Sequence, residues 1–150
     1  MNKKILVAVS VLCVAIIIAG IIFYYNSQIA NLKKADLVTD LSISEITSDL
    51  PYDANDPNTY NHLLITGTVT NMGLGTAHNA GLHVVAVDAT GEKVIDMTVP
   101  IAAGTYGLGG NQGGPFTLND LPSKEIGQVD VAIYHKSIAA TWTITPVWTN

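Results

Sequence analysis

The stretch LLITGTVTNMGLGTAHNAGLHVVAVDATGEKVIDMTVP, residues 63–100, decides the fold of this chain. Residues 63–71 and 81–88 alternate apolar with polar or small side chains, which is the period of a half-buried β-strand. Glycines mark the turn between them. Asp88-Ala89-Thr90-Gly91 is typical of a hairpin turn, and it leads into a third strand at 93–100. This stretch therefore predicts consecutive antiparallel strands.

The same alternation recurs on both sides of this stretch. We expect four further strands, at residues 37–47, 116–118, 127–135 and 141–148. Turn-forming residues separate them, and no amphipathic helix interrupts the series. About seven strands in this length predict an all-β fold, an immunoglobulin-like antiparallel sandwich that forms a single domain over residues 37–150.

A different pattern fills the N-terminus. Residues 5–25 form an apolar run without a charged side chain, and Lys3 and Lys4 precede it. As a helix, this run is about 30 Å long, the thickness of a bilayer core. Its last three residues are aromatic, which suits the headgroup region. We expect residues 1–25 to be a single-pass transmembrane signal-anchor with a cytoplasmic N-terminus, and residues 26–36 to link it to an extracytoplasmic domain.

Processed leaders are the alternatives to an uncleaved anchor. A secretory signal has an apolar core of about 7–15 residues and then a small-x-small cleavage site, and no such pair of small residues follows this run. The segment is similar to a type IV pilin leader in its basic start and apolar helix. Lys4-Ile5 lacks the Gly or Ala, and the early Glu, of that family's processing site. Cys13 follows Leu12 in mid-run, which excludes a lipoprotein signal.

The charges exclude one class of partner. All 12 acidic residues follow residue 35, and the chain has lysines but no arginine. From residue 26 onward, five lysines against these acids give a formal charge of −7. Nucleic acid binding requires a basic surface that displaces phosphate counterions, so no nucleic acid partner is expected. Adsorption to anionic lipid is disfavoured for the same reason.

A family resemblance covers residues 67–91. The pattern Gly67-x-Val69-x-Asn71, a loop with small residues, an alternating strand and then Asp88-x-x-Gly91 resembles FxLYD-type domains and the related CARDB-like adhesion modules. The Phe-x-Leu-Tyr-Asp signature itself is absent, since Val85-Ala86-Val87-Asp88 keeps only the final Asp. These families are small sandwiches on bacterial and archaeal surface proteins. The resemblance implies a surface or adhesion-like accessory role without catalysis.

One loop, residues 48–61, carries a candidate metal site. Oxygen-bearing side chains gather in it, the donors that calcium prefers: Asp53, Asn55, Asp56 and Asn58. Pro57 and Asn58 occupy the fifth and sixth positions, so the order of an EF-hand fails. The hypothesis is a looser calcium site, and the alternative is a pair of Asx-turns. No other cofactor is expected, because the four histidines lack the short spacings and cysteine partners typical of zinc.

Aromatic residues suggest a binding surface. Tyr106 lies in the glycine-rich stretch 104–114, which lacks the Lys-Ser/Thr of a phosphate-binding loop and is interpreted as a flexible connection or a contact loop. We expect Trp148, near the C-terminus, to expose its ring and Trp142 to lie in the core. With Tyr60 and Tyr134, these rings are candidates for a glycan platform.

No arrangement of nucleophile and base is visible, and we expect no enzyme. The sequence favours a membrane-anchored extracytoplasmic structural or interaction protein, an accessory or subunit of a cell-envelope assembly. A linker of about ten residues reaches a few tens of Å, so a protein partner is expected near the membrane surface. The alternative is a tethered module that binds calcium or a glycan.

Overall fold

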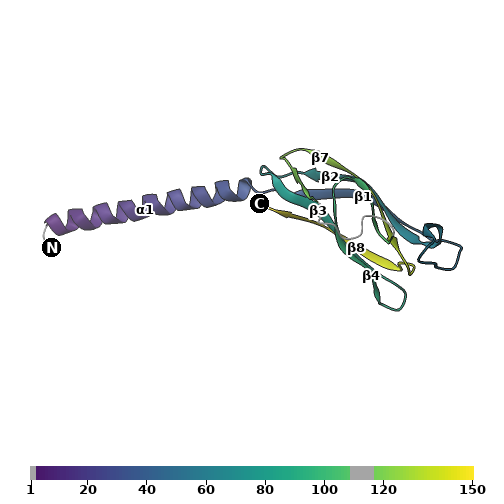
Figure 1. The fold of residues 1–150 in the computed structure, drawn as a ribbon. Helices are drawn as coiled ribbons and strands as arrows, with labels where there is room; N and C mark the ends of the chain where they lie inside the picture. Colours follow the sequence, from purple (N-terminus) through teal and green to yellow (C-terminus); the bar gives the residue numbers. More distant parts are fainter. Residues whose placement is uncertain (1–2, 109–116) are drawn as a thin grey trace. The chain divides into compact units, whose positions relative to one another are not determined.

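The computed structural model describes residues 3–108 and 117–150, with only the backbone for residues 3–13 and 31–32. The chain divides into two compact units, residues 1–34 and residues 35–150. The first contains the helix α1 (Lys3–Leu32), and the second, here called the head, contains all the described strands (Figure 1).

The helix α1 runs for 30 residues to Leu32. Most of the predicted linker, residues 26–36, is therefore helical. Within the residues that the structure describes, no helix combines the length and the apolar character needed to cross a membrane. The predicted membrane segment, residues 5–25, lies partly outside the described side chains, and the anchor stays a prediction from the sequence.

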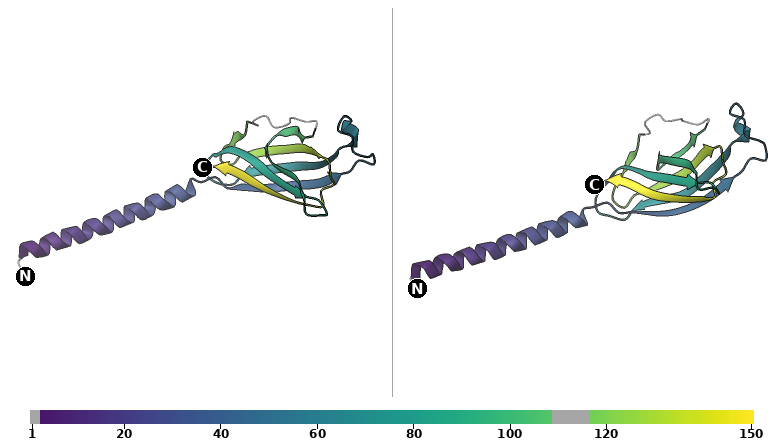
Figure 2. Two further views of the ribbon diagram at one scale, coloured as in Figure 1. Left: turned by 60° about the horizontal axis from the view of Figure 1, so that its bottom comes forward. Right: turned by 90° about the horizontal axis from the view of Figure 1, so that it is seen from below.

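The head is an all-β sandwich of two sheets, as predicted (Figure 2). The first sheet contains, in spatial order, β1 (Leu37–Ile46), β2 (Asn61–Asn71), β7 (Ile126–His135) and β5 (Ala103–Gly107). In the second sheet, β3 (Ala77–Val87) has β4 (Lys93–Pro100) and β8 (Thr141–Thr149) as its partners, and the short β6 (Asn119–Leu121) pairs with its first residues.

Two strands differ from the prediction. The short strand expected at 116–118 is β6, three residues later, and residue 116 lies outside the described part. At the start of the glycine-rich stretch, which was interpreted as a connection or contact loop, β5 forms and pairs in parallel with β7, so the prediction that all strands pair antiparallel was wrong. The chain returns through β6 to the end of the head where β5 began, and β7 therefore runs in the same direction as β5.

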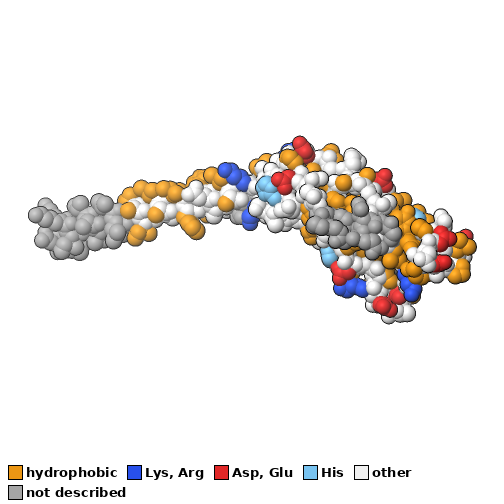
Figure 3. Space-filling model, in the orientation of Figure 1, with side chains coloured by type: hydrophobic (Ala, Val, Ile, Leu, Met, Phe, Trp, Pro, Cys, Tyr) orange, Lys and Arg blue, Asp and Glu red, His pale blue; other side chains and the backbone are white. Residues whose placement is uncertain are grey.

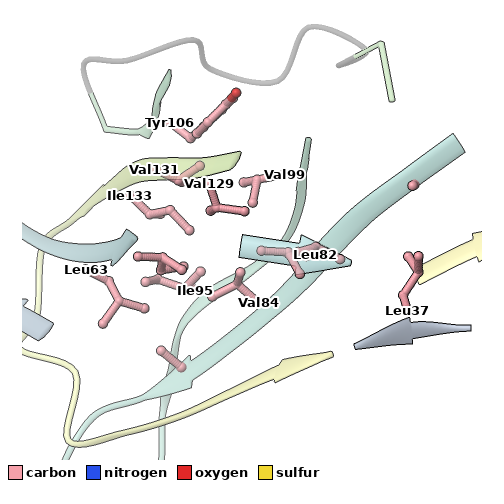
Figure 4. Close-up of a cluster of buried hydrophobic side chains, with 14 of the residues drawn as sticks. Leu37, Leu63, Leu82, Val84, Ile95, Val99, Tyr106, Val129, Val131 and Ile133 are labelled. Atoms are coloured by element: carbon pink, nitrogen blue, oxygen red, sulfur yellow. The ribbon is translucent and has the colours of Figure 1, made fainter. Parts of the chain in front are cut away.

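The core lies between the sheets and consists of the inward side of each alternation (Figure 4). The predicted inward rows are buried: Leu82, Val84 and Ala86 of β3, and Val129, Val131 and Ile133 of β7. The two tryptophans differ from expectation. Trp142 is opposite buried Ala86 but lies at the start of the edge strand β8, and it is 36% exposed. Trp148 is partly buried and packs against the core.

The glycine of the Gly67-x-Val69-x-Asn71 pattern lets β1 and β2 approach each other. Gly67 has a φ of +139°, and a Cβ there would overlap the carbonyl oxygen of Asp40 on β1. We expect Gly67→Ala to lower the free energy of unfolding by about 1–3 kcal/mol. Urea unfolding of the detergent-solubilised full chain measures this. Gly91→Ala is the matched control, because Gly91 has a φ of +86° and open space around it. Equal losses in the two variants would contradict the clash.

Candidate functional site

The outer face of the first sheet is organised in five rows that the strand register defines. From the end where the chain enters the head, the rows are Val38–Thr70–Ile126, Asp40–Thr68–Gln128, Ser42–Thr66–Asp130, Ser44–Leu64–Ala132 and Ile46–His62–Tyr134. The second and third rows are polar. The first and last rows carry apolar and aromatic side chains, so the two ends of this face are candidates for binding.

The last row belongs to an aromatic cluster at the end of the head opposite Ala35, here called the tip. The ring centroids of His62 and Tyr134 are 5.0 Å apart, and those of Tyr60 and Tyr134 are 6.5 Å apart. Tyr52 stacks on Tyr60 at 5.6 Å, and Nζ of Lys136 lies 5.3 Å from the centroid of the Tyr52 ring. Four rings and a cation thus form one contiguous cluster, in which the Tyr60 ring is buried and the Tyr52 ring is exposed.

The loop after β1 holds this cluster in place. The Tyr60 hydroxyl donates to the carbonyl oxygen of Ala54 at 2.7 Å, and burial, followed by Tyr52, Asp53 and Asp56, raises the pKa of Tyr60. Tyr60 therefore keeps its proton and its bond. Apolar side chains of the same end, such as Leu50 and Ile138, are more than half exposed. Figure 3 shows hydrophobic and acidic side chains mixed at the tip.

The candidate calcium residues surround a single 3₁₀ turn, Pro57–Thr59. Oδ1 of Asp53 accepts the backbone N–H and the side-chain amide of Asn55, at 2.9 and 3.2 Å. Oδ1 of Asp56 accepts from Asn58 in the same way, at 3.0 and 2.8 Å. These are Asx-turns, the alternative interpretation of the loop. Among the described residues, no three His, Cys, Asp or Glu side chains gather to hold a metal ion. Calcium stays a prediction.

The two predicted binding residues are not part of the tip surface. Tyr106 is 5% exposed and belongs to the core, where burial raises the pKa of its hydroxyl. Most of the glycine-rich stretch 104–114 that contains it lies outside the described residues. Trp148 packs against the core. The ring expected to be exposed at Trp148 is therefore partly buried, and binding by Tyr106 and Trp148 stays a prediction.

A shallow groove of about 270 Å³ lies beside the aromatic cluster. Its lining is Val94, Gly107, Leu108, Tyr134, His135 and Lys136. Gly107 is opposite Tyr134 in the parallel β5–β7 pair and has a φ of +78°, and a Cβ there would overlap the Tyr134 carbonyl oxygen. The absence of a side chain at Gly107 therefore preserves the close pairing of the strands at the edge of the cluster.

A buried ionisable pair lies on the inner face beneath the cluster. Nε2 of His135 and Oε2 of Glu45 are 3.2 Å apart, with side chains 3% and 10% exposed. Neither atom has an aligned hydrogen bond, and the contact is an ion pair when His135 is protonated. Nδ1 of His135 lies 2.6 Å from the carbonyl oxygen of Ser137, and the backbone N–H of Ala139 donates to Oε1 of Glu45 at 3.1 Å. The pair ties the β7–β8 loop to β1.

The exposed histidines pair with carboxylates on the surface, as expected of scattered histidines. Nδ1 of His78 lies 2.8 Å from Oδ2 of Asp120, and this hydrogen bond lowers the pKa of Asp120. Nε2 of His83 lies 3.4 Å from Asp96, whose pKa is lowered chiefly by its hydrogen bond with Lys93. These are local surface interactions away from the tip.

Three members of the cluster were not predicted from the sequence: Tyr52, His62 and Lys136. Their signal was their position, because Tyr52 lies within the turn-rich loop 48–61, His62 directly follows it, and Lys136 directly follows β7. The chain matches no protein-family model, and no curated protein and no solved structure is similar to it. The resemblance of residues 67–91 to FxLYD-type and CARDB-like domains stays a prediction.

Proposed function

We propose that this protein is a membrane-anchored extracytoplasmic interaction protein, an accessory or subunit of a cell-envelope assembly, and that its tip binds a protein partner. The head is assigned to the immunoglobulin-like class of sandwiches, whose strand ends and loops commonly carry binding residues. Residues 5–25 anchor the chain, with the N-terminus cytoplasmic. The protein is proposed to act by binding and not by catalysis.

The support for the anchor is the sequence. Its 21 consecutive residues without a charge match the length that a bilayer core requires. A backbone in hydrocarbon must satisfy its own hydrogen bonds, and a continuous helix such as α1 does so. The acidic head is suited to water and disfavours adsorption to anionic lipid.

The observation that carries the proposed role is the aromatic cluster at the tip. Tyrosines are enriched at protein interfaces, because they combine a large apolar ring with a polar end. A strand of ten residues is about 33 Å long, so the tip is about that far from the point where the chain enters the head.

Site-specific photo-crosslinking in native membranes tests the proposal. Tyr52→p-benzoyl-phenylalanine is expected to give an adduct with one dominant protein, identified by mass spectrometry, because Tyr52 is exposed and lies in the cluster. Gln128→p-benzoyl-phenylalanine is the matched control, since Gln128 is exposed in a polar row of the same sheet. Adducts of equal yield at both positions, or none at position 52, would contradict a partner at the tip.

A glycan is the second candidate ligand, favoured by the exposed ring of Tyr52, which stacks on the buried Tyr60 ring. Aromatic side chains present apolar faces against which the C–H groups of a sugar ring can pack. The same experiment separates the two ligands, because a glycan adduct contains no foreign peptide after proteolysis. An adduct with carbohydrate alone would replace the protein partner by a glycan, with the tip still the binding site.

A further inference from the structure

The other end of the sheet face carries a second apolar surface, here called the proximal patch: Val38, Met72, Leu74 and Ile126. These side chains are 51%, 52%, 59% and 60% exposed. Val38 and Ile126 lie in the first row, on either side of Thr70. Met72 and Leu74 extend the patch into the β2–β3 loop. Four exposed large apolar side chains at one end of a small head require an explanation.

The loop that presents Met72 and Leu74 is fixed by hydrogen bonds. The backbone N–H of Met72 donates to the Asp36 carbonyl oxygen at 2.7 Å, and Ser123 Oγ donates to the Gly73 carbonyl oxygen at 2.7 Å. The buried side chain of Asn71 accepts from the Gly73 N–H and donates to the Gly75 carbonyl oxygen. The exposure of Met72 and Leu74 is therefore built into the fold of the loop.

We infer that the proximal patch contacts the bilayer that holds the chain's own anchor, within its headgroup region. This inference rests on the proposed membrane anchor. A helix of 30 residues is about 45 Å long, close to the thickness of a bilayer with its headgroups. With α1 across the membrane, Leu32 lies near the outer surface of the headgroups, and the head begins three residues later, at Ala35.

Lipid is the proposed partner of the patch, because the patch lies close to the residues that join the head to the anchor. Met72 bonds to Asp36, and Val38 is the second residue of β1, so both lie within a few residues of the point where the head joins the anchor. Apolar side chains at such a position can reach the headgroup region. Because the head is acidic, the contact depends on apolar burial, and neutral phosphatidylcholine is the appropriate lipid.

Spin labelling of the full chain tests the inference. Cys13 is the only cysteine, so Cys13→Ala gives a background for single labels. Nitroxides are attached to Leu74→Cys, Ile126→Cys, Leu50→Cys and Ile17→Cys in phosphatidylcholine vesicles, and collisions with oxygen and with a water-soluble nickel chelate are measured. We expect positions 74 and 126 to favour oxygen several-fold more than position 50. Leu50 is the matched control, because it is 55% exposed and belongs to the tip loop.

Position 17, near the middle of the apolar run, separates failure of the inference from failure of the anchor. If position 17 favours oxygen and positions 74 and 126 behave like position 50, the patch does not contact lipid and the anchor stands. If position 17 also favours nickel, the chain is not inserted and both proposals fall. Labels at 74 and 126 that are shielded from both reagents would place the patch against protein, which overturns the lipid contact.

Discussion

Replacing Asn71 by Asp is expected to destabilise the head by about 3–5 kcal/mol near neutral pH, although the two side chains have the same shape. Asn71 is fully buried. Its amide nitrogen donates to the carbonyl oxygens of Gly75 and Leu121 at 2.8 and 2.9 Å. Its Oδ1 accepts from the backbone N–H groups of Asp36 and Gly73, both at 3.1 Å. A carboxylate keeps the two acceptor bonds but turns its second oxygen toward two carbonyl oxygens.

The same substitution has a defined pH dependence. Burial and the facing carbonyl oxygens raise the pKa of the new carboxyl group in the folded state, above its unfolded value of about 3.9. A raised folded pKa means that the charged form is penalised, so the variant is least impaired below about pH 4, where the group is protonated in both states. The deficit relative to the native protein therefore grows as the pH rises from 4 to 7.

Urea unfolding of the detergent-solubilised full chain at pH 4 and pH 7 measures both effects. The control is Asn119→Asp, the same change on an exposed side chain of β6, for which we expect a shift within about 0.5 kcal/mol. If the Asn71→Asp variant loses little unfolding free energy, or loses the same amount at both pH values, the amide donors of Asn71 do not matter. This position is also the Asn of the Gly67-x-Val69-x-Asn71 pattern.

Alternation predicted the sandwich because each strand encodes its own inward side. Alternation within one strand identifies its core residues without knowledge of the neighbouring strands, as it does for Leu82, Val84 and Ala86. The tip could not be predicted in this way, because Ile46, His62 and Tyr134 form a row only through the register of three strands. The position of one aromatic residue in a sequence does not show whether its side chain is exposed. The sequence could therefore predict Tyr106 and Trp148 as binding residues, although their side chains pack inward.

The parallel pairing of β5 was hidden for a related reason. The sequence of residues 103–107 is short and glycine-containing, and its place beside β7 depends on the return of the chain through β6. The membrane anchor is the opposite case. Its pattern is local and strong in the sequence, and half of that pattern lies on residues whose side chains the structure does not describe. Local patterns can be predicted, whereas contacts between distant segments require the three-dimensional structure.

His135→Leu is expected to destabilise the head by about 3–5 kcal/mol, because it leaves the Glu45 carboxylate buried without its ion-pair partner. It also removes the donor to the Ser137 carbonyl oxygen. His78→Leu is the matched control. It breaks the exposed contact with Asp120, half of whose side chain meets solvent, and it should hardly change stability. Similar losses in the two variants would mean that the buried pair contributes no more than the surface pair.

Glu45→Gln separates the charge of this pair from its hydrogen bonds. A carbonyl oxygen only accepts, so Nδ1 of His135 carries a proton toward Ser137. In the Gln variant a neutral His135 leaves Nε2 able to accept a hydrogen bond. A Gln side chain supplies the donor and still accepts from the Ala139 N–H. We therefore expect Glu45→Gln to cost less than about 1.5 kcal/mol, and to make His135→Leu less harmful when the two are combined, because no buried charge remains.

The loss of this pair should also affect the tip. His135 lies between Tyr134 and Lys136, and Lys136 contacts the Tyr52 ring. The side chain of Asn61 holds the same segment by donating to the Lys136 carbonyl oxygen at 2.9 Å. In membranes that contain the folded variant, His135→Leu should thus reduce photo-crosslinking from position 52, whereas His78→Leu should leave it unchanged. An unchanged adduct with His135→Leu would separate the buried pair from the binding surface and confine its role to stability.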